Sequence, residues 1–248
     1  MKFLLIGGVG NQLFVLARAL TIGNDVAVIK HFGQSHNIFL QKIGVSVHRD
    51  WLGIEQIAKQ HKLVVKKVNL IDIIELAVVL LVKKILKLNW DQCEQRTILN
   101  WNLGYFHSSE KTSCEAVLSI AKSIDTFLID LNDIPAAESV VHNRQGDMPE
   151  KFRLTSDEIL NFRLNVDPTA YIIEAAPTGK NVYKETSDSE IYDFNLIRGS
   201  KNVLFGASTF AFWAVIASKN LNEKKIWVKA IYVLRKNISR FSKNVQDS

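Results

Sequence analysis

The feature that most constrains the fold is the way the chain begins. An apolar stretch at residues 2–6 runs into the glycine-rich segment 7–12. A helix is predicted over about 12–20, and a second apolar strand over 25–29. A strand, a tight turn, a helix and another strand are the usual opening of an α/β domain. The glycines interrupt the apolar start early, which favours a first β-strand over a signal peptide.

The same alternation of strands and helices continues along the chain. Segment 130–137, which contains Pro135, is predicted to be a linker. Further helices are expected over about 51–60, 70–88, 110–124, 157–160, 186–196 and 208–218, and further strands over about 140–143, 171–173, 202–205 and 226–228. The predicted fold is therefore α/β, with two Rossmann-like lobes of mainly parallel strands at residues 1–137 and 138–248.

Residues 70–88 are the most apolar stretch of the chain. Their few charged side chains fall near one line at helical spacing, and these are Asp72, Glu75, Lys83, Lys84 and Lys87. A helix with so narrow a polar stripe is either mostly buried or lies in a membrane interface. The pattern favours packing in the core. It excludes a transmembrane span, because charges at both ends leave too short an uncharged run.

The bulk composition is that of a globular protein, with 47% hydrophobic and 23% charged residues. The two cysteines, Cys93 and Cys114, form neither a disulfide framework nor a metal-binding pattern, which favours the cytoplasm. Residues 219–248 hold eight Lys and Arg against two acidic residues, a balance equal to the +6 of the whole chain. This basic tail suits an anionic lipid surface or a nucleic acid, or it is a solvated basic helix. The chain has no zinc-finger spacing or RNA-binding aromatic motif, so no nucleic-acid partner is expected.

The most chemically informative segment is Val140-Val141-His142-Asn143-Arg144-Gln145-Gly146-Asp147. Two β-branched residues lead directly into His, Arg and Asp, which is typical of a buried strand that delivers charged groups at its carboxyl end. Arginine is well suited to bind phosphate, because its planar guanidinium donates two parallel hydrogen bonds. A structural ion pair between Arg144 and Asp147 is the simpler alternative.

Two glycine-containing turns are also predicted between a strand and a helix. Segment 7–12 differs from the dinucleotide fingerprint and from the Walker loop, but its glycines let backbone N–H groups approach a ligand. Segment 206–210, Gly-Ala-Ser-Thr-Phe, places hydroxyl groups at the start of a helix, where an anion can bind. A tight turn in the first case and an ordinary N-cap in the second remain the alternatives without a ligand.

Four segments in order resemble one family. Residues 7–14 read Gly-Gly-Val-Gly-Asn-Gln-Leu-Phe, and 103–111 read Leu-Gly-Tyr-Phe-His-Ser-Ser-Glu-Lys. Residues 141–147 read Val-His-Asn-Arg-Gln-Gly-Asp, and 207–214 read Ala-Ser-Thr-Phe-Ala-Phe-Trp-Ala. Together they resemble the motifs of the family 11 glycosyltransferases, the bacterial and animal α-1,2-fucosyltransferases.

The resemblance implies a GT-B-like fold and an inverting transfer of fucose from GDP-fucose, without a metal or other cofactor. Arg144, Asp147 and His142 match motif positions with catalytic or structural roles, and Arg144 would bind the donor pyrophosphate. The implied donor-binding residues are Gly8, Gly10, Asn11, Gln12, Arg144, Ser208, Thr209 and Phe210, and the acceptor-binding residues are Tyr105, His107 and Glu110. The expected acceptor is a surface-polysaccharide oligosaccharide (O-antigen or capsule) or a lipid-linked glycan, which fits a cytoplasmic protein in peripheral contact with an anionic membrane.

The chain departs from the family pattern at the donor site. Gln145 replaces a second arginine, Met148 replaces a tyrosine, and Ala175-Ala176 stand where an acidic turn usually follows a strand. These changes raise two alternatives. The protein is a transferase that uses another sugar nucleotide, or it is an inactive relative that binds glycans or assembly partners. The catalytic base is left open between Asp147, Glu110 and His107, which can all accept a proton.

Overall fold

The chain forms two compact units, Met1–Ser123 and Ile124–Ser248, in a computed structural model. The structure describes residues 1–5, 7–23, 27–30, 53–94, 97–104, 106, 112–124, 137–144, 150–175, 187–229, 238–243 and 245–247. The division falls at 123/124, whereas the sequence placed it at 137/138, and residues 125–136 between these points lie outside the described residues. Each unit contains one sheet of parallel strands, so the predicted Rossmann-like α/β class is confirmed.

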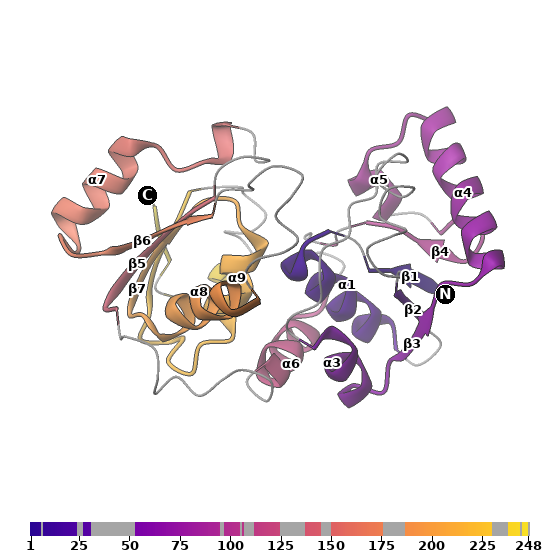
Figure 1. Ribbon diagram of the computed structural model, residues 1–248, viewed down its shortest axis with the longest axis horizontal. Helices are drawn as coiled ribbons and strands as arrows, with labels where there is room; N and C mark the ends of the chain where they lie inside the picture. The colour runs from indigo at the N-terminus through magenta and orange to yellow at the C-terminus, as the bar shows by residue number, and fades with distance from the viewer. Residues whose placement is uncertain are drawn as a thin grey trace. The chain divides into compact units, whose positions relative to one another are not determined.

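Unit 1 is built on a four-stranded parallel sheet with the order β3-β2-β1-β4 (Figure 1). Its strands are β1 (Lys2–Leu4), β2 (Ala27–Lys30), β3 (Val64–Lys67) and β4 (Trp101–Asn102). The sequence predicted β1 and β2 but not β3, where two lysines interrupt the apolar pattern. The expected loop-like segment that starts at residue 101 begins instead with the short strand β4.

Helices cover both faces of the unit 1 sheet (Figure 1). They are α1 (Val9–Ile22), α3 (Ile54–Gln60), α4 (Leu70–Ile85), α5 (Trp90–Glu94) and α6 (Cys114–Ile124). Helix α4 packs on one face through Leu76 and Val79, which contact the β-strand residues Leu4 and Ile29 in a common core. Helices α1 and α3 lie on the opposite face, where α1 is buried along nearly its whole length.

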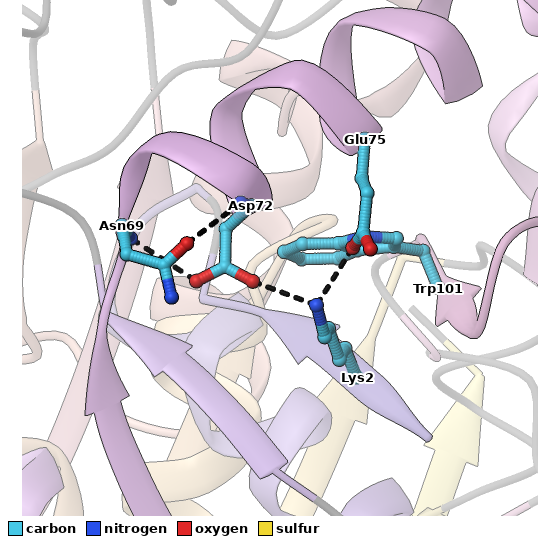
Figure 2. A network of polar contacts seen from close by, with 5 residues as sticks. All are labelled: Lys2, Asn69, Asp72, Glu75 and Trp101. Carbon is cyan, nitrogen blue, oxygen red and sulfur yellow. Dashed lines mark hydrogen bonds and ion pairs between the residues drawn. The ribbon is translucent and has the colours of Figure 1, made fainter.

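Helix α4 is oriented with its acidic side toward the sheet (Figure 2). Asn69 and Asp72 form a capping box, and the second carboxylate oxygen of Asp72 accepts a 2.8 Å bond from Lys2 Nζ. Glu75 accepts from Lys2 Nζ at 2.6 Å and from Trp101 Nε1 at 2.8 Å. These hydrogen bonds from Lys2 and Trp101 lower the pKa of Glu75. The two acidic residues therefore lie on the side of α4 that is fixed to the sheet.

The expectation that helix 70–88 is mostly buried in the core is wrong, because α4 packs there along one side only. Only Asp72, Leu76 and Val79 of α4 are buried. Six apolar side chains on the other side are exposed, and these are Leu70, Ile71, Ile74, Val78, Leu81 and Ile85. The sequence pattern fixed the helix but not its orientation, because the lysine that binds its acidic residues lies on β1, about 70 positions away. None of the described helices is long and apolar enough to cross a membrane.

Unit 2 is built on a five-stranded parallel sheet with the order β6-β5-β7-β8-β9 (Figure 1). Its strands are β5 (Ser139–Arg144), β6 (Tyr171–Ala175), β7 (Asn202–Phe205), β8 (Lys225–Val228) and β9 (Val245–Asp247). Val141 faces α7 (Ser156–Asn165), where it shares a core with Phe162 and Leu204. Helices α8 (Ser187–Gly199) and α9 (Thr209–Ile216) cover the opposite face, and α9 is buried except at Phe210.

The described residues of the C-terminal segment are part of the unit 2 fold rather than one solvated basic helix. They supply β8 and β9, and two of their lysines make contacts within unit 2. Lys224 is buried and its Nζ donates to the backbone oxygens of Ile197, Arg198 and Ser200, at the end of α8. Burial lowers the pKa of Lys224 to about 7. Lys229 pairs with Glu158, the capping-box residue of α7, at 2.9 Å.

Candidate functional site

The order of the strands in unit 2 identifies where a ligand would bind. From β5 the chain moves outward to β6, and it then returns past β5 to form β7. The connections that leave β5 and β7 therefore run in opposite directions. In open α/β sheets ligands bind beyond the carboxyl ends of the two strands at such a reversal. We call this place the unit 2 edge, and it consists of Arg144 at the end of β5 together with segment 206–210 after β7.

The unit 2 edge brings together three residues that the sequence singled out. Arg144 is the last residue of β5 and is half-buried. His142 precedes it by two positions, on the same face of the strand, and stacks on Phe210 of α9 with 5.7 Å between ring centroids. Phe210 in turn contacts Phe194 of α8 edge to face. This aromatic contact fixes the start of α9 beside the carboxyl end of β5.

His142 is neutral in the folded protein. The ring is only 2% exposed, and burial together with the charge of nearby Arg144 lowers its pKa to about 4. Its Nδ1 has no hydrogen-bond partner among the described residues. A neutral, buried ring of this kind is a poor acid at pH 7, and it is suited to position the neighbouring guanidinium and Phe210. The structure thus favours a positioning role for His142.

Other polar groups at the unit 2 edge come from β5 and β6. Asn143 is buried, and its side-chain oxygen also lacks a partner among the described residues. In the register of the sheet, Asn143 lies opposite Glu174, and Arg144 lies opposite Ala175. Glu174 is exposed. Buried polar atoms without partners are uncommon in folded proteins and point to a ligand, a water or an undescribed segment at this edge.

The turn after β7 is shaped by packing as well as by any ligand. A Cβ atom on Gly206 would lie 2.8 Å from the backbone oxygen of Phe152, in the 3₁₀ helix Glu150–Phe152. Ser208 is fully buried, and its hydroxyl accepts from the N–H of Ala211 at 3.2 Å as the N-cap of α9. Ser208 therefore acts as the predicted N-cap. Thr209 and Phe210 are the first two residues of α9.

Asp193 is a candidate that the sequence did not indicate. It lies on α8, next to Phe194, which contacts Phe210. Burial raises the pKa of the Asp193 carboxyl to about 6. A carboxylate with a raised pKa is a common general base. The shift is caused by burial in the folded protein, so it could not be predicted from the sequence.

The corresponding edge of unit 1 lies beyond β1 and β4, where the order 3-2-1-4 reverses. Gly7 has a φ of 74°, so the turn after β1 needs glycine there. The buried side chain of Gln12 donates to the backbone oxygen of Gly7 at 3.0 Å and braces the turn. Gly8 is the N-cap of α1, with open space where a Cβ would stand. Asn11 and Gly10 lie in the first turn of α1, where Asn11 N–H donates to the Gly8 oxygen at 2.9 Å.

Glu94 lies at the unit 1 edge beside the end of β4, and no sequence pattern points to it. Its carboxylate accepts a 2.5 Å bond from the N–H of Phe106 and is 5% exposed. A Cβ on Gly104 would lie only 2.0 Å from Glu94 Cγ. Burial lowers the pKa of Arg18, on α1, and the charge of Glu94 opposes this. Residues of the chain itself therefore fill much of this edge.

Several predicted site residues lie outside the described residues. They are Tyr105, His107, Glu110, Gln145, Asp147, Met148 and Ala176. Their assignments remain predictions, as does the choice of catalytic base among Asp147, Glu110 and His107. Within the described part of the chain, no group of three or more His, Cys, Asp or Glu side chains is placed to hold a metal ion.

Comparisons with known proteins do not name a family. No family model, curated protein or solved structure matches this chain. The class that the fold defines is therefore an α/β protein with two Rossmann-like units, each with a parallel sheet whose strand order reverses at one place.

Proposed function

We propose that this protein is an inverting glycosyltransferase of the family 11 type, with a GT-B-like arrangement of its two units. It would move fucose from GDP-fucose to a hydroxyl group of a surface-polysaccharide oligosaccharide. The observation that carries the proposal is the place of Arg144, which ends β5 at the strand-order reversal of unit 2, beside the start of α9.

The positions of the four motif segments support the proposal. Segments 7–14 and 103–111 follow β1 and β4, the two strands at the reversal in unit 1. Segments 141–147 and 207–214 lie at the ends of β5 and β7, the two strands at the reversal in unit 2. Ligand sites of α/β proteins lie at these places, which supports a donor-binding or acceptor-binding role for the described residues of the motifs.

The proposed chemistry needs a cation at the unit 2 edge. In an inverting transfer, the acceptor oxygen forms a bond to the anomeric carbon while the bond from that carbon to the nucleoside diphosphate breaks. The diphosphate leaves with the electron pair, and the acceptor proton passes to a base. The guanidinium of Arg144 and the N–H groups at the start of α9 would stabilise the charge that develops on the diphosphate.

The experiment is a panel of nucleotides in thermal unfolding, followed by a test for hydrolysis of the matching sugar nucleotide. GDP at saturating concentration is expected to raise the melting temperature by about 5 °C or more, whereas UDP, CMP and dTDP leave it unchanged. GDP-fucose is then expected to be hydrolysed slowly without an acceptor. If another nucleotide gave the shift, the fucose assignment would fail but the transferase class would stand.

An inactive relative that binds glycans is the second candidate. Ala175, which lies opposite Arg144 in the sheet, favours it, because the family places an acidic turn there to bind the nucleotide base. This candidate predicts no shift with any nucleotide and a shift with an oligosaccharide alone. The same panel, with fucosylated and unfucosylated oligosaccharides added, separates the two functions.

A further inference from the structure

We infer that the outward face of α4 is a docking surface for an anionic lipid bilayer. This surface, which we call the α4 face, consists of Leu70, Ile71, Ile74, Val78, Leu81 and Ile85. Their exposed fractions run from 40% at Val78 to 72% at Leu70. At about 100° per residue, the six positions fall within one arc of about 100° on the helix.

The α4 face is the reverse of what a solvent-exposed helix normally presents. Surface helices direct their apolar stripe to the core and their charges to water. Here Asp72 and Glu75 point to the sheet and bind Lys2 (Figure 2). The isoleucine, leucine and valine side chains of the α4 face are exposed instead. A contiguous exposed apolar patch of this kind marks an interaction site.

The charges around the α4 face select an anionic bilayer as its occupant. Residues 62–88 contain six lysines and two acidic residues, and both acids are paired with Lys2. Exposed Lys66 and Lys67 precede the helix, and exposed Lys84 and Lys87 follow in and after its last turn. Aliphatic side chains with flanking lysines, and without a fully exposed carboxylate among residues 62–88, match a lipid surface with anionic headgroups. A second copy of the chain would place one set of lysines against another.

Among the described residues, the basic tail offers a weaker lipid surface than α4. In the basic tail, Lys224 is buried against the end of α8 and Lys229 is paired with Glu158. From the sequence, the basic tail is the first candidate for contact with anionic lipid, and helix 70–88 is the second. The structure assigns that role to α4 instead, because only there does an exposed apolar face of this size adjoin exposed lysines among the described residues.

The experiment is cosedimentation of the full chain with vesicles, and the chain offers a matched control. Leu81 and Ile85 are 55% and 68% exposed and four residues apart on α4. Leu160 and Leu164 are 54% and 70% exposed and four residues apart on α7. We compare Leu81→Gln/Ile85→Gln with Leu160→Gln/Leu164→Gln. Glutamine is a good helix former, so both variants are expected to fold, and circular dichroism checks this.

The wild-type chain is expected to bind vesicles that contain phosphatidylglycerol, and to bind phosphatidylcholine vesicles much less. The α4 variant is expected to lose at least about tenfold in partitioning, and the α7 variant to keep wild-type binding. Lys84→Gln/Lys87→Gln is expected to lower binding by about fivefold per lysine, only on the anionic vesicles.

Three outcomes would overturn the inference. The first is that the wild-type chain does not bind anionic vesicles, and the second is that the α4 and α7 variants bind equally. The third is that Leu81→Gln/Ile85→Gln converts a dimer into a monomer in size-exclusion chromatography with light scattering, which would make α4 a self-association surface. None of these outcomes bears on the nucleotide panel, so this inference and the proposed function can fail separately.

Discussion

The carboxyl edges of the two sheets are built from the same kind of parallel strands, but they differ in charge. In unit 1, buried Glu94 accepts the N–H of Phe106, and Gln12 braces the glycine turn. In unit 2, the edge carries Arg144. Both edges have buried polar atoms without a partner among the described residues, Asn102 Oδ1 in unit 1 and His142 Nδ1 and Asn143 Oδ1 in unit 2, so the difference between them is one of charge. An edge whose carboxylate binds a backbone N–H of its own loop holds that loop, whereas an edge that carries an arginine is suited to an anion.

The largest expected effect is that of Arg144→Ala at the unit 2 edge. Removal of the guanidinium is expected to lower turnover of the sugar nucleotide about 100-fold or more, because the leaving diphosphate loses its main charge partner. Lys201→Ala is the control, since Lys201 is an exposed cation that directly precedes β7, at the opposite end of that strand. Steady-state kinetics measures both. Equal activity in the two variants would contradict the assignment of the edge.

Gly104→Ala tests whether unit 1 closes its own edge. The new methyl group would overlap Glu94 Cγ, which lies 2.0 Å from its position, and would displace the carboxylate from Phe106. We expect the free energy of unfolding to fall by about 3 kcal/mol. Gly8→Ala, with open space and a φ of −67°, is expected to cost about 1 kcal/mol or less, because alanine is only a poorer N-cap there. Urea denaturation measures both, and a similar loss in the two variants would refute the difference.

The neutral state of His142 predicts a dependence of stability on pH. The pKa is about 4 in the folded protein and about 6.5 when unfolded, so the unfolded chain binds more protons between these values. Stability therefore rises with pH through this window and falls on acidification. From pH 6.5 to pH 5, we expect this residue alone to cost about 2 kcal/mol. His142→Phe keeps the stack on Phe210 and is expected to reduce this slope in thermal melts; an unchanged slope would contradict the prediction.

Asp193 is expected to change the pH dependence of stability less than His142 does, and in the opposite direction. Its folded pKa of about 6 exceeds the unfolded value of 3.8, so the folded protein binds more protons in this window and loses stability as the pH rises. Asp193→Asn is expected to stabilise the fold by about 1 kcal/mol at pH 7, after allowance for solvent screening, and by almost nothing below pH 4. Denaturation at the two pH values measures this. A loss of turnover without a loss of stability would indicate that Asp193 acts as a base.

Much of the fold could be predicted from local patterns. Strands β5 and β7 follow from short β-branched and apolar runs, and their predicted bounds differ from the structure by one residue or less. Strand β3 could not be predicted, because Lys66 and Lys67 remove the apolar pattern at the edge of a sheet. Strand β9 also went unpredicted, as three residues within a polar terminus.

The candidate site was only partly accessible from the sequence, for a physical reason. Arg144 and segment 206–210 could be found because each follows a predicted strand, and parallel strands end at a common edge. Glu94 and Asp193 could not be found, because what distinguishes them is burial by residues distant in the chain. The orientation of α4 was missed for the same reason, since it depends on Lys2.

The pairing of Lys2 with α4 also has a consequence for the order of folding. The capping box of α4 joins residues only three apart, so the helix can form early and locally. The direction of its apolar side is decided later, when β1 enters the sheet and Lys2 meets carboxylates 70 and 73 residues downstream. Until then the newly formed helix exposes apolar side chains on both sides. A chain without the Lys2 amine is therefore expected to aggregate during refolding before it loses measurable native stability.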